Sequence, residues 1–409
     1  MFHRAQRIFG LLLLVTLLAT LPAVAAPAAA GGRIYFQAAG TGGYSDIFSM
    51  NPDGSDVAQL TDSPTSDYSP DISPDGRRVV FVSDRDGYAQ IYVMNADGSD
   101  EVRLTGGAGM SFDPVWSPDG QRIAFISTRE GTMEVFTMTA TGGNVTNITQ
   151  HAAADFNMAP AWSPDGARIA FSSKRQAMSE IFVHTLGQPV DANNPIRLTD
   201  TIGWSGYPDW SPDGGRVVFV RFQNFEQDIY VMDANGDNPT PLTDDDFTDY
   251  TPDWSPDGTQ IAFAGLRGGD NRRRIYLIDP DGSDLSGPIG NGSEPSWGVR
   301  PAGRAKLTVT QVVAGGAPAA SWHFNGPLGA FALPSAGGSR TLIYLDAQTT
   351  TVSQISRPGY TTTAACSNGA TGGATVTVTL ASDSAVTCTF TSTLRATPLS
   401  VYLPAVRKQ

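Results

Sequence analysis

The chain has 409 residues, a formal net charge of -13 and two cysteines. Charged residues make up 16% of it, below the roughly 25% of typical globular domains, while 44 glycines and 28 prolines indicate many turns. The acidic balance argues against a nucleic-acid partner, because phosphate binding needs clustered lysine and arginine. Two cysteines exclude a four-cysteine zinc site and a disulfide-dense scaffold. The composition favours a globular β protein.

The N-terminus is typical of an export signal. Two arginines precede an apolar stretch over residues 11–21, and residues 23–25 (Ala-Val-Ala) match the pattern of a cleavage site. We therefore expect a signal peptide over residues 1–25, with cleavage as late as residue 30 as an alternative. The apolar stretch is short for a membrane span, and a retained anchor is the lesser interpretation. We expect the mature chain to be exported, without membrane insertion, to the periplasm, the cell surface or the medium.

A repeat of about 45 residues follows, which is a period typical of propeller blades. Three strings recur in each copy and begin in the first copy at Arg33, Ile47 and Leu60. Each string is short, apolar or β-branched and bounded by turn residues, as strands are. The remaining strand type, the first of each repeat, precedes Ser-Pro-Asp-Gly, with a degenerate sixth copy at Ser296. The five full copies of Ser-Pro-Asp-Gly begin at Ser73, Ser117, Ser163, Ser211 and Ser255.

Four strands per repeat, six times over, predict a six-bladed β-propeller over residues 32–300. The mature sequence begins with the second strand type, at Arg33–Phe36, and the repeats end with the first strand type, near Pro295–Gly298. One blade is therefore expected to combine three N-terminal strands with one C-terminal strand. This overlap closes the ring without exposed edges. The repeated tryptophans and methionines are expected to pack between blades.

The strings Trp-Ser-Pro-Asp-Gly, Ile-Ala-Phe, Ile-Tyr-Val-Met and Leu-Thr resemble the WD-like repeats of the TolB family of β-propellers. The resemblance implies the propeller fold and a periplasmic role of the kind that TolB has in the Tol-Pal envelope system. TolB carries an α/β domain before its propeller. Only a few residues separate the cleavage signal from Arg33, so we expect this chain to lack that domain.

Residues 305–393 are rich in threonine, alanine, glycine and serine, and their alternating segments predict a small β-sandwich. The pattern resembles the prealbumin-like (CNA-B-like) domains of bacterial surface proteins. Some of those domains carry a Lys–Asn isopeptide bond, and the matching positions here are Gln311, Gln354 and Ser392. A glutamine amide cannot replace the lysine amine, so we expect no such bond. Residues 394–409 form a C-terminal tail.

Cys366 and Cys388 are the only cysteines in the chain. Export places them in an oxidising compartment, where cysteine pairs form disulfides. We therefore expect a disulfide between them, and two buried free thiols are the alternative.

The sequence shows no cluster typical of catalysis. It lacks the Gly-x-Ser-x-Gly elbow of α/β-hydrolases, and the three histidines of the mature chain lie in separate segments. The acidic turn at residues 279–284 lacks the spacing of a calcium loop, so we interpret it as a hairpin turn, with calcium as a lesser alternative. The basic run at residues 272–274 is interpreted as a solvated hairpin tip, with a phosphate site as the alternative. We expect no enzymatic activity and no cofactor.

The loops between blades predict a partner-binding face. Residues 31–304 hold 19 basic and 38 acidic residues, and these loops combine carboxylates with aromatic side chains. Such a face suits a basic or polar partner, although solubility alone would also explain the acidic residues. The candidate residues are Tyr68, Phe112, Trp204, Tyr207, Asp244, Asp245, Asp246 and Phe247.

The sequence therefore predicts an all-β, exported, non-enzymatic binding or scaffold protein. We expect a monomer whose propeller recognises a protein partner in the cell envelope or outside the cell. Two alternatives remain open. One is a propeller enzyme that acts on a glycan or a small ligand through paired carboxylates, and the other is a purely structural envelope or matrix protein.

Overall fold

The structure is a computed structural model. It describes residues 32–299 and 304–394, apart from gaps at residues 41, 108, 151–155, 176–177, 192–193, 224, 315–321, 327–328, 334–337, 347–348, 356–359 and 380–384. The expected signal peptide and almost all of the expected tail lie outside the described residues. Every regular element in the described part is a strand, and a search of that part finds no helix capable of crossing a membrane.

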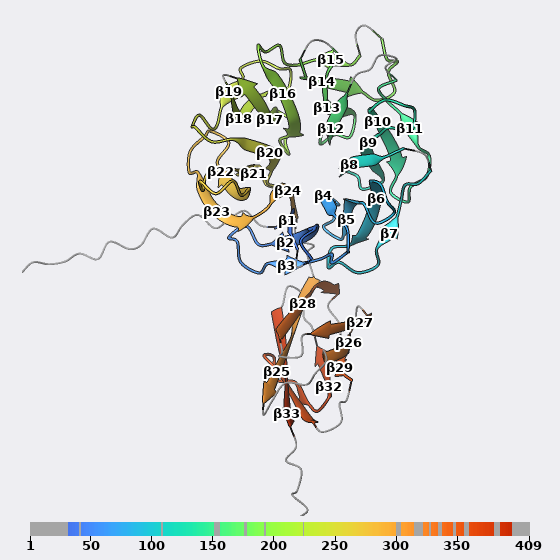
Figure 1. Cartoon of the computed structure of the whole chain (residues 1–409), viewed down its shortest axis with the longest axis vertical. Helices are drawn as coiled ribbons and strands as arrows, with labels where there is room; N and C mark the ends of the chain where they lie inside the picture. The colour runs from blue at the N-terminus through green and yellow to red at the C-terminus, as the bar shows by residue number, and fades with distance from the viewer. Residues whose placement is uncertain are drawn as a thin grey trace, which may run out of the picture.

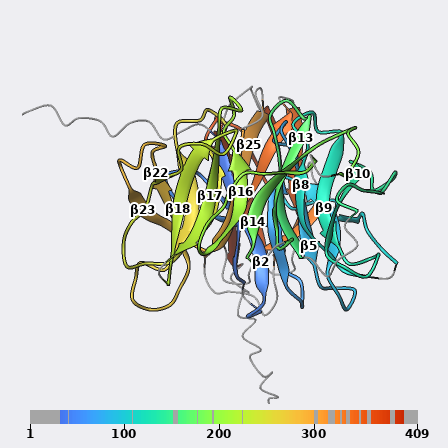
Figure 2. The ribbon, with the colours of Figure 1, turned by 90° about the horizontal axis from the view of Figure 1, so that it is seen from above.

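The repeats form six four-stranded antiparallel sheets arranged as the blades of a ring (Figure 1). The strands run through the thickness of the ring, from one face to the other (Figure 2). The innermost strands of the six blades are β4 (Asp67–Ile72), β8 (Ser111–Trp116), β12 (Asn157–Trp162), β16 (Trp204–Trp210), β20 (Asp249–Trp254) and β24 (Ser293–Gly298). The second strands are β1 (Arg33–Ala39), β5 (Arg78–Ser83), β9 (Arg122–Ser127), β13 (Arg168–Ser173), β17 (Arg216–Gln223) and β21 (Ile261–Gly265).

The two remaining strand types complete each blade towards the rim. The third strands are β2 (Ser45–Met50), β6 (Gln90–Asn95), β10 (Glu134–Thr139), β14 (Glu180–Thr185), β18 (Glu226–Asp233) and β22 (Arg274–Ile278). The outermost strands are β3 (Ala58–Gln59), β7 (Val102–Arg103), β11 (Thr146–Asn147), β15 (Ile196–Arg197), β19 (Thr240–Pro241) and β23 (Ser286–Asn291).

The ring closes as the sequence predicted. Strand β24, from the end of the repeats, pairs antiparallel with β1, with Arg33 opposite Gly298 and Ile34 opposite Trp297. The first blade therefore has the order β24-β1-β2-β3. The six-bladed propeller expected from the repeats is confirmed.

The outermost strands differ from the prediction in one respect. They were expected at the Leu-Thr strings, but β3 ends at Gln59, just before Leu60. The leucine N–H still donates to the carbonyl oxygen of Ile47, at 2.8 Å. The Thr61 hydroxyl then accepts from the Ile47 N–H at 2.9 Å. The threonine side chain thus replaces the next backbone pair and ends the strand. Four other blades repeat this bond with Thr105, Thr149, Thr199 and Thr243.

Neighbouring blades pack through the repeated tryptophans. In four blades a buried tryptophan ends the innermost strand, and an arginine from the preceding blade lies over its ring. The guanidinium carbon of Arg78, for example, lies 4.5 Å from the ring centroid of Trp116. Such cation–π contacts add to apolar packing. The equivalent pairs are Arg122–Trp162, Arg168–Trp210 and Arg216–Trp254.

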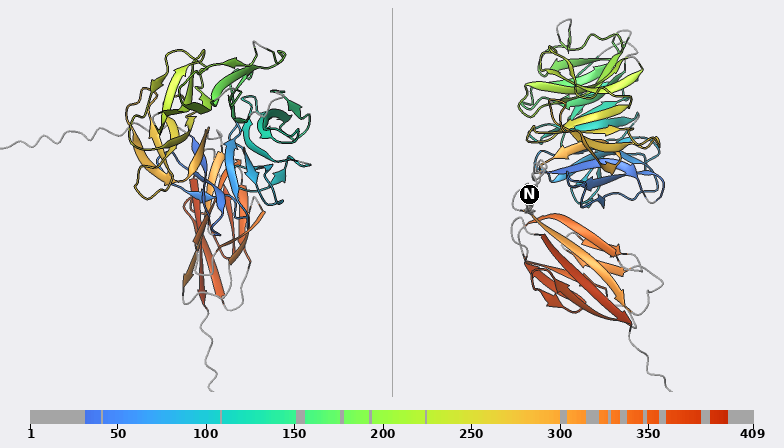
Figure 3. Two further views of the ribbon diagram at one scale, coloured as in Figure 1. Left: turned by 45° about the horizontal axis from the view of Figure 1, so that its top comes forward. Right: turned by 90° about the vertical axis from the view of Figure 1, so that its left-hand side faces the viewer.

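Residues 304–394 form a second, all-β unit made of two sheets that share one core, seen apart from the blades in Figure 3. The first sheet has the order β28 (Gly338–Asp346), β25 (Arg304–Ala314), β33 (Ala385–Leu394), β30 (Tyr360–Cys366) and β31 (Thr371–Gly372). The second sheet has the order β27 (Gly329–Leu333), β26 (Trp322–Gly326), β29 (Thr349–Gln354) and β32 (Thr375–Thr379). This arrangement is the β-sandwich that the alternating segments predicted.

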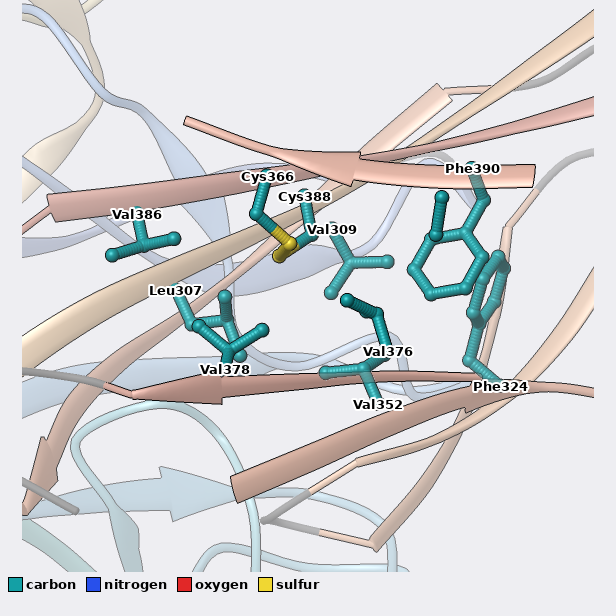
Figure 4. Close-up of a cluster of buried hydrophobic side chains, with 11 residues drawn as sticks. Leu307, Val309, Phe324, Val352, Cys366, Val376, Val378, Val386, Cys388 and Phe390 are labelled. Atoms are coloured by element: carbon teal, nitrogen blue, oxygen red, sulfur yellow. A yellow bond between two sulfur atoms is a disulfide. The ribbon is translucent and has the colours of Figure 1, made fainter. Parts of the chain in front are cut away.

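The predicted disulfide joins Cys366 and Cys388, which lie opposite each other on adjacent strands. Figure 4 shows the bridge inside the apolar core, between the side chains of both sheets. Phe324 and Phe390 meet edge-on in the same core, with ring centroids 5.2 Å apart.

The three positions aligned with an isopeptide site also meet, but as a hydrogen-bonded cluster. The Gln354 amide donates to Gln311 Oε1 at 2.7 Å and to Ser392 Oγ at 3.3 Å. All three side chains are buried. The cluster satisfies its own polar atoms, which buried amides require.

We expect no free thiol when the unreduced protein is denatured and titrated with a thiol reagent. Reducing the Cys366–Cys388 bridge should lower the free energy of unfolding of the sandwich by about 3 kcal/mol. The two cysteines are 22 residues apart in the sequence, and the bridge restricts the unfolded chain by closing this loop. Urea unfolding with and without dithiothreitol measures the change, and the propeller transition serves as the internal control. Two titratable thiols in the unreduced protein would contradict the bridge.

Candidate functional site

The six innermost strands line a central cavity of about 300 Å³. In Figure 1 these strands stand around the middle of the ring. Each contributes a proline to the wall, and the residues directly before and after that proline line the cavity as well. The six prolines are Pro70, Pro114, Pro160, Pro208, Pro252 and Pro295.

Each residue before these prolines has an unusual backbone conformation. Its φ is positive, between 45° and 53°, although none of the six residues is glycine. The register of each innermost strand shifts at the same point, which marks a β-bulge. Such bulges turn side chains in a new direction and are frequent beside functional sites. The six residues are Ser69, Asp113, Ala159, Tyr207, Thr251 and Glu294.

The bulges bring five carboxyl groups to the cavity wall. Asp113 and Glu294 precede a proline, whereas Asp71, Asp209 and Asp253 follow one. The described lining residues include no lysine or arginine. The cavity is therefore an acidic channel without a charge partner of its own in its described wall.

Three of these carboxyl groups, those of the aspartates that follow a proline, accept a tryptophan N–H from the next blade. Asp71 Oδ2 accepts from the Trp116 N–H at 2.6 Å, and Asp71 Oδ1 accepts from Ser296 Oγ at 2.8 Å. Asp209 accepts from the Trp254 N–H at 2.9 Å. Asp253 accepts from the Trp297 N–H at 2.7 Å. In each aspartate at least one oxygen is thus committed to the ring itself.

Burial raises the pKa of the channel carboxyls. It raises the pKa of Asp71 to about 6 and that of Asp209 to about 7, and the nearby Asp71 charge adds to the effect on Asp209. Burial and the Asp209 charge raise the pKa of Asp253 well above its usual value. The side chains of these three aspartates are half-buried, because the side that faces the channel is open. Protein surrounds them elsewhere, and this desolvation disfavours the charged form.

A second hydrogen-bond network surrounds Glu294 in the channel wall. Ser69 donates to Glu294 Oε2 from its N–H at 3.0 Å and from its hydroxyl at 2.9 Å. The Ser69 N–H also reaches Gln37 Oε1, at 3.2 Å. Burial and the Asp113 charge raise the pKa of Glu294, while Arg273 opposes that shift.

The sequence-predicted residues differ in how they relate to the channel. Tyr207 lines the channel, and the half-buried Tyr68 directly precedes the channel residue Ser69. Phe112 is half-buried and packs against the core between its own blade and the next one. Trp204 stacks on Phe222 of its own blade, with centroids 6.0 Å apart.

The acidic loop at residues 244–247 contacts Arg267. The guanidinium binds Asp245 and Asp249, and it lies 5.6 Å from the ring centroid of Phe247. Asp244 and Asp246 are exposed. Of the eight predicted residues, Tyr207 alone is among those that line the channel, and this loop lies outside that set.

Sequence reasoning missed the channel carboxyls themselves. Their signal was present in the sequence, where the dipeptide Pro-Asp stands directly before the apolar residue that ends the strand. The aspartates of these dipeptides are Asp71, Asp209 and Asp253. The β-bulge turns these side chains towards the axis of the ring, and no residue type in the sequence predicts that bulge.

No group of three or more His, Cys, Asp or Glu side chains among the described residues is arranged to hold a metal ion. In each of Asp71, Asp209 and Asp253, one carboxylate oxygen already accepts a backbone N–H from the next blade. The arrangement instead suits a cationic organic group, which needs only charge and a few acceptor oxygens.

Comparison with known proteins agrees with this architecture. The family description "TolB beta propeller domain" matches residues 23–109, 86–155, 101–194 and 152–297, which together span more than half of the chain. No curated protein matches the chain.

Solved structures show the same fold. The chain resembles TolB from Acinetobacter baumannii at a TM-score of 0.57 and 22% identity, covering 66% of this chain and 67% of that one. It resembles a putative TolB from Agrobacterium tumefaciens at 0.53 and 21%, covering 66% and 93%. Hydrazine synthase from Kuenenia stuttgartiensis gives 0.50 and 12%, covering 88% and 69%.

We predict that replacing Asp209 by Asn removes a pH-dependent cost of folding. The folded protein binds this proton more tightly than the unfolded chain does, so the Asp209 contribution to stability falls as pH rises from about 4 to about 7. The stability of D209N relative to wild type should therefore increase over this range, by on the order of 1–2 kcal/mol.

Urea unfolding at a series of pH values measures this difference. D284N, at an exposed turn residue, serves as the matched control and should parallel wild type. Parallel profiles for D209N and wild type would show that the Asp209 pKa is not raised.

Proposed function

We propose that this chain, which belongs to the TolB beta-propeller domain family, is an exported, non-enzymatic binding protein whose propeller holds a segment of a partner protein. The signal-like N-terminus supports export to the envelope or the medium. A monomeric propeller followed by a small sandwich suits a scaffold, in which the propeller is the main contact and the sandwich a spacer or second contact.

The channel carboxyls are the observation that carries this proposal. Five of them line one cavity, and the described wall offers no cation to neutralise them. A lysine, an arginine or an amino terminus entering the cavity would supply the missing charge and donate to the free carboxylate oxygens. The preferred ligand is therefore a cationic segment of a partner.

The surrounding acidic surface supports the same choice of partner. Residues 31–304 carry twice as many acidic as basic residues. Such a field draws positively charged partners towards the propeller and raises their association rate, an effect that salt weakens. We propose that Asp244 and Asp246, which are exposed on the loop before β20, belong to this approach surface together with Phe247.

Affinity capture tests this function. The mature full-length protein is expected to retain one protein with a basic segment from envelope or medium fractions, identified by mass spectrometry. D209N/D253N keeps the shape of both side chains but removes their charge. We expect its affinity for the partner to fall at least tenfold, equivalent to about 1.4 kcal/mol of binding free energy.

D284N is the matched control for capture, because it removes an exposed charge outside the channel lining. It should retain the partner as wild type does. Equal capture by a D209N/D253N protein that remains folded would contradict the channel as the site. Hydrolysis or elimination on a glycan panel that a single channel Asp change abolishes would instead favour an enzyme.

A further inference from the structure

A second cavity lies where the ring closes. It has a volume of about 570 Å³ and is lined from the first blade by Gln37 and Ser45 and from the last blade by Arg272 and Arg273. Ser293 of the closing strand β24 completes this part of the wall. We refer to it as the seam cavity. Ser293 lines the seam cavity and the next residue, Glu294, lines the channel, so the two cavities are neighbours.

The seam cavity has the opposite charge to the channel. Its described lining contains two arginines and no carboxylate, within a propeller that is acidic overall. The structure also divides the basic run that the sequence shows. Arg274 is bound by Asp270 at 2.5 Å, while Arg272 and Arg273 face the cavity.

The two cavity arginines are weakly neutralised. Arg272 Nε lies 3.9 Å from Asp270 Oδ2, a carboxylate that Arg274 already occupies. The guanidinium carbon of Arg273 lies 4.4 Å from the ring centroid of Tyr250, and its side chain makes no ion pair with any described residue. Stacking holds a guanidinium by its face and leaves its N–H groups free to bind in the ring plane.

Polar groups of the closing strands complete the wall. The Gln37 amide donates to Ser293 Oγ at 3.1 Å, and its oxygen accepts from the Ser69 N–H, which also donates to Glu294. These bonds fix the amide at the boundary between the seam cavity and the channel. The two arginines and Ser45 line the same space.

We infer that the seam cavity binds a compact oxyanion, a carboxylate or a phosphate group, through Arg272 and Arg273. Arginine is well suited to this task, because its planar fork matches the paired oxygens of either group. The inference is independent of the proposed function of the channel, since it rests on the charge and shape of a different cavity.

Calorimetric titration of the mature full-length protein with inorganic phosphate and with succinate, at constant ionic strength, tests the site. Binding of phosphate alone would identify a phosphate-bearing ligand, and binding of succinate would identify a carboxylate; either result supports the site. R272Q/R273Q should weaken binding at least tenfold. Both side chains are exposed, so its melting temperature without ligand should match wild type.

R77Q is the matched control. Arg77 is an exposed arginine whose Nε also lies 3.9 Å from an aspartate oxygen, on Asp75, in a Ser-Pro-Asp-Gly turn outside the seam cavity. It should bind both anions as wild type does. The inference is overturned if wild type binds neither anion, if R272Q/R273Q binds them equally well, or if R77Q weakens binding to the same extent.

Discussion

The pairing of β24 with β1 is the constraint on which the rest of the propeller depends. It joins strands about 260 residues apart and pairs the backbone groups at the two sheet edges that an open chain of blades would expose. It also completes the channel, because Glu294 and Ser296 enter the wall on the closing strand. Ser296 donates to Asp71 of the second blade, and the Trp297 N–H donates to Asp253 of the last blade. The closing strand therefore contacts both neighbouring blades.

The channel shows how a structural device creates a binding surface. The aspartates after the prolines accept N–H bonds from the next blade, which holds the blades in register. Burial makes their ionised form costly, so their pKa values rise and a cation in the channel would be favoured. We therefore expect these carboxyl groups to lower the stability of the ring at neutral pH.

The fold was predictable because its signals are periodic. Turn residues, strand strings and tryptophans recur at one spacing, and the strand types at the two ends specified the closure. The exact end of the outer strands was not predictable, because Thr61 and its equivalents replace a backbone acceptor by a hydroxyl. The disulfide followed from the two cysteines and the expected compartment.

The candidate site was predictable only in its chemistry. Acidic and aromatic residues on the blade connections pointed to a basic partner, but half-buried Phe112 and Trp204 pack against apolar cores. The channel carboxyls stood within a repeated packing motif, and their direction depends on bulges with positive φ at residues such as Asp113 and Glu294. Such a conformation results from packing around the axis, which no local sequence window contains.

The central claim is that the channel carboxyls bind a cation. Titration calorimetry with tetralysine at about pH 6.5, in two buffers of different ionisation enthalpy, tests it through proton linkage. A bound ammonium group favours the ionised carboxyls, so wild type should release protons and its heat should differ between the buffers. D209N/D253N should bind more weakly and release fewer protons. Equal heats in both buffers for wild type, or an unchanged signal in the variant, would contradict the account.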